Sequence, residues 1–349
     1  MSQPNRKLKI VGVGEVLWDL LLTGPQLGGA PANFSYHAQA LGAEAAIITR
    51  VGHDDYGREI IRRLGNMGLP EAAIQVDESA PTGTVKVELS GEGLTHYTVQ
   101  QNVAWDCIAA TPEALAYASS ADAFCFGSLA QRSAASRHTI QKLLAATPAT
   151  ALRIFDINLR QNFYSREVIE QSLEHSNALK MNDDELPTLA AMFNLESPYG
   201  TSTCGADIPV RVSEPNKTLA STKPPTPTSQ QSHTRHQIKR LAEIFNLQLV
   251  ALTRGAHGSL LYQRKDGIDR WSDCTSHPVK VVDTVGAGDS FTAALVHGLL
   301  RNMDLDEINS IANEVARYVC SQSGGTPTLP PEFANRFSPA AAPLQKRIS

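Results

Sequence analysis

Short apolar runs alternate along the chain with stretches in which apolar residues recur at helical spacing. The apolar runs, which predict buried strands, lie at 7–13, 45–50, 122–129, 152–159, 247–255 and 259–264. Helical spacing at 32–41, 56–67 and 238–245 predicts amphipathic helices. Strands that alternate with helices predict a parallel sheet with helices on its faces, an α/β fold.

Residues 82–102 break this rhythm. The segment TGTVKVELSGEGLTHYTVQQN alternates apolar and polar positions around a central Gly-Glu-Gly, which predicts an antiparallel hairpin. A hairpin inserted in an α/β chain is often a lid over a site. Val85, Val87 and Leu89 would form its apolar face, which we expect to pair with a second copy of the chain in a homodimer.

Two segments are predicted to lie outside the packed core. Residues 197–234 are rich in Ser, Thr and Pro and poor in large apolar residues, which predicts a disordered insertion within one domain. Residues 336–349 are predicted to form a flexible tail. The remaining chain, residues 1–335, is expected to form a single domain.

Composition narrows the classes of partner. The 349 residues are 42% hydrophobic and carry a formal net charge of −4, which argues against a nucleic-acid partner. No window approaches the ~18 apolar residues of a membrane span, and no apolar signal core precedes the first predicted strand. Five dispersed cysteines lack CxxC spacing, so neither a zinc site nor a disulfide framework is expected. We expect a cytoplasmic protein that binds neither nucleic acid nor a membrane.

The sequence VVDTVGAGDSF at 281–291 carries the strongest chemical signal. Gly286, Ala287 and Gly288 predict a turn whose backbone N–H groups converge on an anion at the start of a helix. Asp289 would lie beside that anion, where a carboxylate is unfavourable unless it acts as a general base. The pattern favours a phosphoryl-transfer site, although a capped helix after a glycine turn would show the same spacing.

Five sequence blocks together resemble the ribokinase-like (PfkB-type) sugar kinases, most closely their fructokinase-type members. The segment DTVGAGDSF resembles the C-terminal signature of that family. The other blocks occur in family order along residues 8–330 and are GGAPAN at 28–33, VGHDDYG at 51–57, KMNDDE at 180–185 and TRGAHG at 253–258. The resemblance implies a ribokinase-like three-layer α/β/α sandwich with a small β lid.

The resemblance also implies roles for individual residues. Asp289 matches the catalytic base, and residues 286–288 match the anion hole that holds the transferring phosphoryl group. Asn182 and Glu185 match a pair that organises Mg²⁺ largely through water, and their i, i+3 spacing places both on one face of a predicted helix. The residues that match nucleotide contacts, with ATP as the phosphoryl donor, are Lys180, Thr253, Gly255, Gly258 and Asn313.

Other residues are predicted to hold the sugar. Asp19 follows the first predicted strand and could accept hydrogen bonds from two sugar hydroxyls. Gly29 would let the substrate approach the backbone, and Asn33 would add an amide. Asn158 and Arg160 end a predicted strand that should point at the site, where the arginine could hold phosphate oxygens or a substrate carboxylate.

These matches predict ATP-dependent phosphorylation of a primary hydroxyl of a small sugar. Fructose is the first candidate, because GGAPAN and GEVLWD resemble fructokinase-type members. 2-Keto-3-deoxygluconate is the second, since Arg160 could pair with its carboxylate, and a nucleoside is the third. A non-catalytic sugar- or nucleotide-binding regulator is the rival from another class, but such a protein would be expected to lack Asp289. The short interval between Asp19 and Gly28 departs from the family pattern, which bears on the sugar rather than on phosphoryl transfer.

Two other nucleotide-binding patterns are excluded. The sequence contains no G-x-x-x-x-G-K-[ST] run, which P-loop kinases require. The segment GVGEVL at 12–17 lacks the third glycine of a dinucleotide-binding turn.

Overall fold

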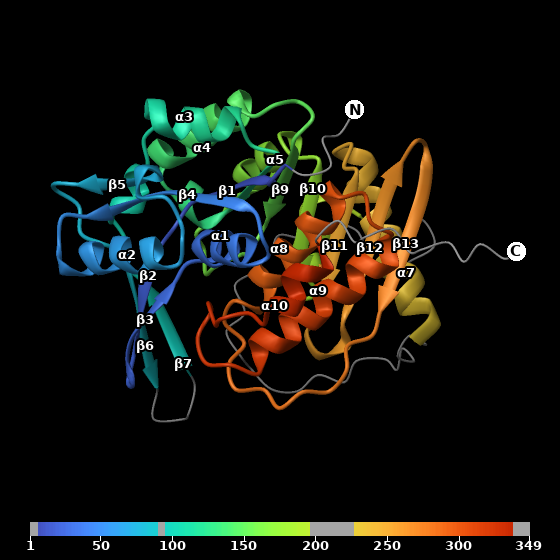
Figure 1. Ribbon diagram of the computed structural model, residues 1–349. Coiled ribbons are helices and arrows are strands. Elements are labelled where there is room, and N and C mark those ends of the chain that lie inside the picture. Colours follow the sequence, from blue (N-terminus) through green and yellow to red (C-terminus); the bar gives the residue numbers. More distant parts are fainter. Residues whose placement is uncertain (1–5, 90–94, 196–226, 338–349) are drawn as a thin grey trace, which may run out of the picture.

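The computed structural model describes residues 6–89, 95–195 and 227–337, and Figure 1 shows their arrangement. The main sheet has nine strands in the order β13-β12-β11-β10-β9-β8-β1-β4-β5. The strands from β11 to β5 in this order are parallel, and β12 and β13 extend the sheet in antiparallel fashion. The bounds are β1 (Lys9–Val13), β4 (Glu44–Gly52), β5 (Ile74–Asp77), β8 (Ala123–Gly127), β9 (Leu152–Asp156), β10 (Ala178–Asn182), β11 (Leu249–Thr253), β12 (Ser259–Lys265) and β13 (Ile268–Cys274).

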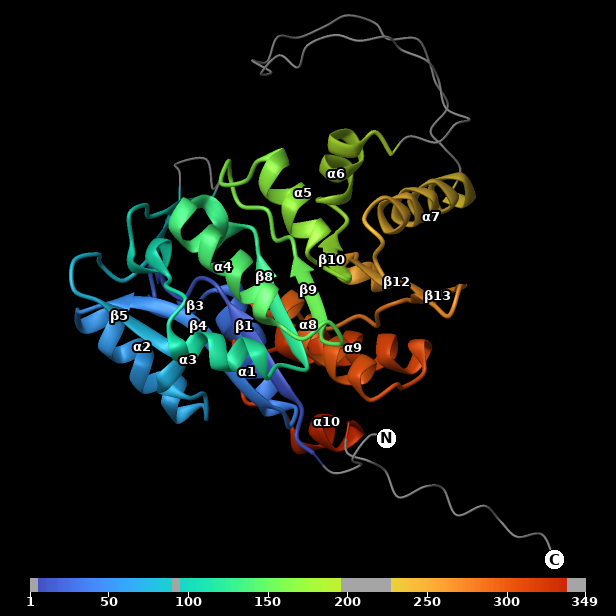
Figure 2. The ribbon, with the colours of Figure 1, turned by 90° about the horizontal axis from the view of Figure 1, so that it is seen from above.

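Helices cover both faces of this sheet, as Figure 2 shows. One layer contains α1 (Ala30–Ala40), α2 (Asp55–Asn66), α8 (Ala287–Leu300), α9 (Leu305–Cys320) and α10 (Pro331–Arg336). The other layer contains α3 (Pro112–Ser119), α4 (Ala134–Ala146), α5 (Arg166–Glu174), α6 (Leu186–Phe193) and α7 (Pro227–Ile244). No helix among the described residues is long and apolar enough to cross a membrane.

The central strands are apolar on both faces because each face is covered. In β1, Ile10 belongs to the hydrophobic cluster under α1 and α8, whereas Val11 and Val13 belong to the cluster under α4 and α5. Parallel strands covered on both sides are expected to be continuous apolar runs. The ribokinase-like three-layer α/β/α sandwich is therefore confirmed, and it places the carboxyl ends of the parallel strands along one edge.

A second, four-stranded sheet forms the lid, in the order β3-β2-β6-β7. The hairpin predicted within 82–102 is confirmed as β6 (Thr84–Leu89) and β7 (Thr95–Val99). A second hairpin, β2 (Leu17–Leu21) and β3 (Gly24–Gly28), was not predicted, and β2 pairs in parallel with β6. The short interval between Asp19 and Gly28 is therefore a tight hairpin that completes the lid.

The lid is fixed to the main body on its outer side. Trp18 of β2 is 2% exposed, and its Nε1 donates a hydrogen bond to the carbonyl oxygen of Tyr56 in α2 at 3.1 Å. Its ring also lies 4.7 Å from the guanidinium carbon of Arg63. Asp54, which caps α2, accepts hydrogen bonds from the backbone and hydroxyl of Thr82, just before β6. The block VGHDDYG thus anchors the stem of the lid.

The inner side of the lid bears on the homodimer prediction. Val85 is 7% exposed and pairs with Val99, and both residues line a pocket of their own chain. This part of the apolar face therefore covers the site within one chain. Pairing of the hairpin with a second copy stays a prediction.

One boundary of the predicted insertion at 197–234 is wrong. Helix α7 begins at Pro227, so the last eight predicted residues are helical. No further proline and no glycine occurs from 228 to 244, and docking of Ile238 and Leu241 in the core stabilises a helix that extends into polar sequence. Residues 196–226, like most of the predicted tail, lie outside the described residues.

Candidate active site

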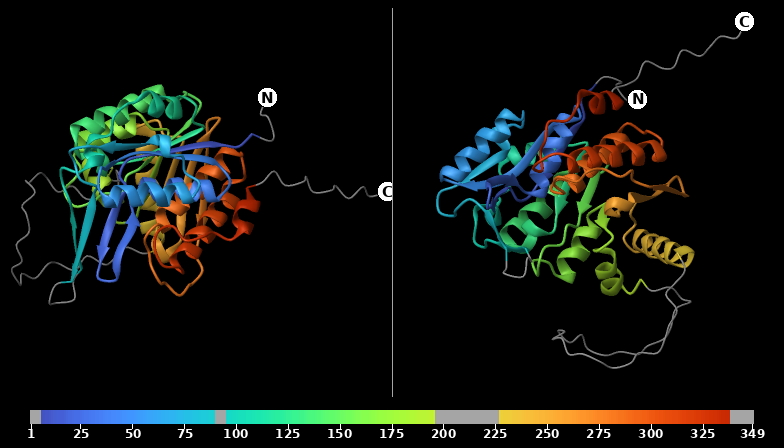
Figure 3. Two further views of the ribbon diagram at one scale, coloured as in Figure 1. Left: turned by 60° about the vertical axis from the view of Figure 1, so that its left-hand side comes forward. Right: turned by 90° about the horizontal axis from the view of Figure 1, so that it is seen from below.

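A pocket of about 1540 Å³ lies between the lid and the carboxyl ends of the parallel strands. Residues that follow β1, β9, β10 and β11 line it, together with the first turn of α8 and residues of the lid. Figure 1 and the left view of Figure 3 show the lid and the 275–286 loop projecting from the same end of the main sheet. Open α/β sheets bind ligands at this end of their strands.

The predicted anion hole lies at the start of α8 and lines this pocket. Gly286 caps the helix with φ of 77°, and a Cβ there would lie 2.2 Å from the carbonyl oxygen of Gly325. A Cβ at Gly288 would lie 3.0 Å from Nζ of Lys180. Gly286 is therefore required by its backbone conformation and surroundings, whereas Gly288 leaves room for the end of the Lys180 side chain. The two glycines present the start of a 14-residue helix, whose first-turn N–H groups lack intrahelical partners, to the pocket.

Asp289 lies in the first turn of α8, partly exposed toward the pocket. Its Oδ2 accepts a hydrogen bond at 2.9 Å from Nδ2 of Asn33 in α1. Burial and the nearby Asp156 raise the pKa of Asp289, Lys180 and the Asn33 hydrogen bond oppose the shift, and the net pKa is about 6. A carboxylate whose pKa lies nearer neutrality is a more effective general base. The structure also shows that Asn33, predicted to hold the sugar, orients this carboxylate.

A buried ion pair lies beside the anion hole. Lys180 Nζ lies 3.0 Å from Oδ1 of Asp156, and both residues are 6% exposed. The other oxygen of Asp156 accepts a hydrogen bond from Thr292 in the second turn of α8 at 3.1 Å. The pKa of Lys180 is raised despite its burial because Asp156, Glu185 and Asp289 surround it. Lys180 was predicted to contact the nucleotide, and its ammonium group lies against Gly288.

The predicted sugar-binding residues converge on the lid side of the pocket. Asp19 of β2 lines the pocket, and burial, followed by repulsion from Asp283, raises its pKa to about 6. A Cβ at Gly28 would lie 2.3 Å from Oδ2 of Asp19. Gly29 has φ of 111°, and a Cβ there would lie 2.5 Å from the carbonyl oxygen of Glu15. Contacts within the protein therefore account for glycine at both positions without reference to a substrate.

Two further residues reach the site from the loop after β9. Asn158 adopts φ of 41° and lines the pocket, as does Arg160. Arg160 is exposed, and its guanidinium donates a hydrogen bond to the carbonyl oxygen of Leu159 at 3.1 Å.

The prediction that Asn182 and Glu185 share one face of a helix is wrong. Asn182 ends β10, and Glu185 immediately precedes α6. The Asn182 backbone N–H donates to Oε2 of Glu185 at 2.8 Å, and the Glu185 N–H donates to Oδ1 of Asn182 at 2.9 Å. Oε1 of Glu185 accepts a hydrogen bond from the Leu159 N–H at 2.8 Å. The i, i+3 spacing comes from a turn in which the side chain of each residue accepts the backbone N–H of the other.

The end of the pocket that contains the predicted nucleotide contacts includes the turns after β11. It is lined by all four of the residues there that were predicted to contact one nucleotide: Thr253, Gly255, Gly258 and Asn313. Gly258 has φ of 85°, and a Cβ there would lie 2.0 Å from the carbonyl oxygen of Cys274. The amide nitrogen of Asn313 donates to Ser259 Oγ at 2.7 Å and to the Asn309 carbonyl oxygen at 2.7 Å. The Asn313 amide is therefore fixed by contacts within the protein.

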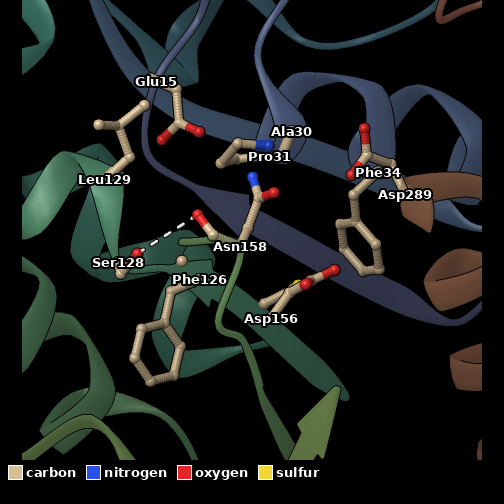
Figure 4. A pocket seen from close by; sticks show the side chains of 12 residues that line it. Glu15, Ala30, Pro31, Phe34, Phe126, Ser128, Leu129, Asp156, Asn158 and Asp289 are labelled. Atoms are coloured by element: carbon tan, nitrogen blue, oxygen red, sulfur yellow. Dashed lines mark hydrogen bonds between the residues drawn. The ribbon is translucent and has the colours of Figure 1, made fainter. Parts of the chain in front are cut away.

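Glu15 was not predicted as a site residue. This residue follows β1, is 3% exposed and lines the large pocket. It also lines a small adjoining cavity, where Figure 4 shows Glu15 and Asp289 on opposite sides. Burial raises its pKa to about 7. The sequence contains one signal for this residue, which is a glutamate directly after a buried strand and a Gly-x-Gly segment. Such a position indicates a site residue because ligands bind where the parallel strands end.

Comparison with known proteins defines the family. The model of the pfkB family carbohydrate kinases matches residues 24–206 and 215–332. A probable fructokinase-3 of Arabidopsis thaliana is 26% identical over 95% of this chain and 91% of its own length. A putative sugar kinase of Pyrococcus horikoshii is 25% identical over 91% of this chain and 92% of its own length. The chain belongs to the pfkB family of carbohydrate kinases.

Solved structures share the fold of this chain. The Pyrococcus horikoshii sugar kinase in complex with ATP matches with a TM-score of 0.70 and 24% identity, over 94% of this chain and 99% of that chain. A putative ribokinase II from E. coli in complex with ATP and Mg²⁺ matches with a TM-score of 0.71 and 20% identity, over 95% of this chain and 98% of that chain. The family match defines the protein as a carbohydrate kinase, and these structures show that it shares the fold of solved sugar kinases.

Proposed function

We propose that this kinase transfers the γ-phosphoryl group of ATP to a hydroxyl of a small neutral sugar, with Asp289 as the general base. The observation that carries the proposal is the position of Asp289 beside the glycine turn that starts α8, with its carboxylate held by Asn33. The pocket of about 1540 Å³ exceeds the ~300–1,000 Å³ of a site for one small ligand. A sugar and a nucleotide can therefore be bound together.

The residues support an in-line transfer. Asp289 takes the proton of the sugar hydroxyl as its oxygen attacks the γ-phosphorus, and ADP leaves on the opposite side. The start of α8 stabilises the charge on the transferring group through its N–H groups. Lys180 adds a fixed positive charge next to Gly288, where Asp156 holds it. The lid excludes water that would otherwise compete with the sugar hydroxyl.

A divalent cation fits this site as a hydrated ion. Mg²⁺ would neutralise charge on the phosphates of ATP. No group of three or more His, Cys, Asp or Glu in the described part of the chain is arranged to hold a metal directly. Both carboxylate oxygens of Glu185 already accept backbone N–H groups, and each retains an acceptor site. We propose that Asn182 and Glu185 hold Mg²⁺ through its water ligands.

The charges at the sugar end favour a neutral substrate. Three carboxyl groups lie there, those of Glu15, Asp19 and Asp289. The positive charge of Arg160 lowers the pKa of each of them. A substrate carboxylate would be repelled by any of these groups that is ionised. We therefore place fructose first. 2-Keto-3-deoxygluconate remains the second candidate, because Arg160 lines the same pocket.

A phosphorylation screen tests the proposal. The purified protein is incubated with MgATP and each of about a dozen substrates, including fructose, 2-keto-3-deoxygluconate and a nucleoside, and ADP and the phosphorylated product are measured. We expect kcat/KM for fructose to exceed that for the sugar acid by at least about tenfold, the effect of ~1.4 kcal/mol. A higher value for the sugar acid would refute the neutral-sugar assignment. ATP binding without turnover of any substrate would instead support a non-catalytic regulator.

A further inference from the structure

Helix α1 carries two buried polar side chains one helical turn apart. Asn33 and His37 are four residues apart, so they lie on the same side of the helix. Asn33 holds the carboxylate of Asp289 in α8. His37 is 0% exposed and reaches a different part of the chain, residues 324–327, which follow α9. Figure 1 shows α1 and α8 side by side on one face of the main sheet.

The imidazole of His37 donates a hydrogen bond to the backbone. Its Nε2 lies 2.9 Å from the carbonyl oxygen of Gly325, and its Nδ1 has no partner among the described residues. Because a carbonyl oxygen only accepts hydrogen bonds, Nε2 carries the ring proton. Burial lowers the pKa of His37 to about 4, so the ring is neutral at the pH at which Asp289 loses its proton. The single N–H of the neutral ring is therefore committed to Gly325.

The segment 324–327 is tied to the protein at two further points. The hydroxyl of Tyr36, which precedes His37, donates to the carbonyl oxygen of Pro327 at 3.0 Å. The backbone N–H of Gly324 donates to Oδ2 of Asp283 at 3.0 Å. Asp283 begins the DTVGAGD sequence that leads into α8. The segment thus connects α1 with the glycine turn at the start of α8.

Gly325 is buried, and it lies against both the glycine turn and the partner of the proposed base. A Cβ on Gly286 would lie 2.2 Å from the carbonyl oxygen of Gly325, so the backbone of Gly286 packs directly on this peptide group. A Cβ on Gly325 itself would lie 2.9 Å from Nδ2 of Asn33, the atom that donates to Asp289. The carbonyl group that His37 holds is therefore in contact with the turn and next to the amide.

We propose that His37 is a positioning residue for phosphoryl transfer, which fixes the Gly325 peptide group and through it both Gly286 and Asn33. The proposal rests on the proposed roles of Asp289 and of the glycine turn. A base and an anion hole act together only when their mutual geometry is held closely, and a misplacement of about 1 Å can cost ~10²-fold in rate. Since His37 is not among the described residues that line the pocket, its loss should affect the rate rather than binding.

The experiment compares steady-state kinetics of wild type, His37→Leu and His37→Gln with MgATP and the best substrate of the phosphorylation screen. Leucine removes the donor and keeps an apolar side chain of similar size. In His37→Leu, kcat should fall about ten- to hundredfold, while both KM values stay within about threefold, because the contacts affected are those of the transition state. Glutamine restores an N–H donor at about the place of Nε2. His37→Gln should therefore recover most of kcat.

His297 in α8 provides a matched control. It is also 0% exposed, its Nε2 lies 3.0 Å from the carbonyl oxygen of Ala38, and its Nδ1 has no partner among the described residues. This hydrogen bond joins α8 to α1 without involving residues 324–327. His297→Leu should lower the melting temperature about as much as His37→Leu and keep kcat within about twofold of wild type. An equal fall in kcat in both variants would show that His37 contributes to stability alone, which overturns the proposal.

The outcomes also separate this inference from the proposed function. Wild-type kcat in His37→Leu, together with an inactive Asp289→Asn protein, refutes the positioning role alone. An active Asp289→Asn protein refutes the proposed function and with it the basis of this inference.

A second variant tests the same support if His37→Leu does not fold. The backbone of Gly325 is outside the left-handed region, so alanine can adopt its conformation, but the added Cβ would press on the amide of Asn33. Gly325→Ala keeps His37 and should lower kcat at least about tenfold with both KM values within about threefold. An unchanged kcat in Gly325→Ala would show that the base and the glycine turn do not depend on this peptide group, and it would overturn the proposal.

Discussion

The proposed sugar end and the proposed nucleotide end of the pocket are built differently. At the sugar end the groups are enclosed and polar, with Glu15 and Asn33 each 3% exposed and Asp289 fixed by a hydrogen bond. At the nucleotide end the wall includes exposed apolar side chains, with Val279 and Val281 38% and 56% exposed. Glycine turns, which offer backbone rather than side chains, make up much of the rest.

This difference predicts which end of the pocket discriminates more strongly between ligands. A site built to hydrogen-bond a hydroxyl discriminates strongly against analogues that lack it, because its enclosed polar groups are then unpaired. An apolar wall discriminates weakly and contributes mainly contact area. We expect substitutions at the sugar end to have large effects and substitutions of the exposed wall at the nucleotide end to have small ones.

The largest effect is expected at the base. Asp289→Asn keeps the hydrogen-bonding shape of the side chain and cannot accept the proton, so kcat should fall ~10²–10⁴-fold. In the wild type, kcat should also fall as pH decreases through about 6, where Asp289 becomes protonated. Steady-state kinetics across pH, with ATP binding measured by calorimetry, checks both effects. Retention of more than about a tenth of the wild-type rate would show that another group is the base.

The stability of Asp289→Asn provides its control. The folded protein holds a proton on Asp289 up to about pH 6, whereas the unfolded chain loses it near its ordinary pKa of ~3.9. This group therefore destabilises the folded state progressively as pH rises from about 4 to 6, and by a constant amount above that window. Removal of the charge should leave the melting temperature at pH 8 unchanged or raised. A lowered melting temperature would attribute the lost activity to misfolding instead.

An intermediate effect is expected from Asp19. Replacement by Asn removes a charged acceptor from the sugar end, and hydrogen bonds to charged groups are worth about 1.5–3 kcal/mol, or roughly ten- to hundredfold. The KM for the sugar should rise by this factor while the KM for ATP stays within about twofold. An equal rise in both KM values would mean that the two ends of the pocket are not separate.

The smallest effect is expected from the exposed apolar wall. Val281→Ser removes apolar contact from the nucleotide end and should raise the KM for ATP about two- to fivefold, corresponding to no more than ~1 kcal/mol. Val282 is the matched control, because it is 58% exposed and adjacent but does not line the pocket. Val282→Ser should therefore leave the kinetics unchanged. Equal effects of the two substitutions would show that the wall does not contact ATP.

The elements with regular patterns could be predicted from the sequence. Buried strands and amphipathic helices follow from apolar periodicity, and the start of α8 follows from two glycines and Asp289 in one short segment. The hairpin at 17–28 was missed, because five-residue strands with a tight turn carry little periodic signal. The turn of Asn182 and Glu185 was assigned to a helix, because i, i+3 spacing suits both a helix face and a closed turn.

Residues close together in the chain were enough to predict the strand–helix alternation of the α/β fold, the glycine turn at 286–288 and the carboxylate of Asp289 that follows it. The surroundings of that carboxylate depend on tertiary packing. Asn33 contacts Asp289 across 256 positions of sequence, and residues from four other parts of the chain line the small cavity beside Glu15. A hydrogen bond between distant elements, the burial of a carboxyl group and a cavity of about 10 Å³ all depend on how the helices and strands pack. No local pattern of residue types records that packing.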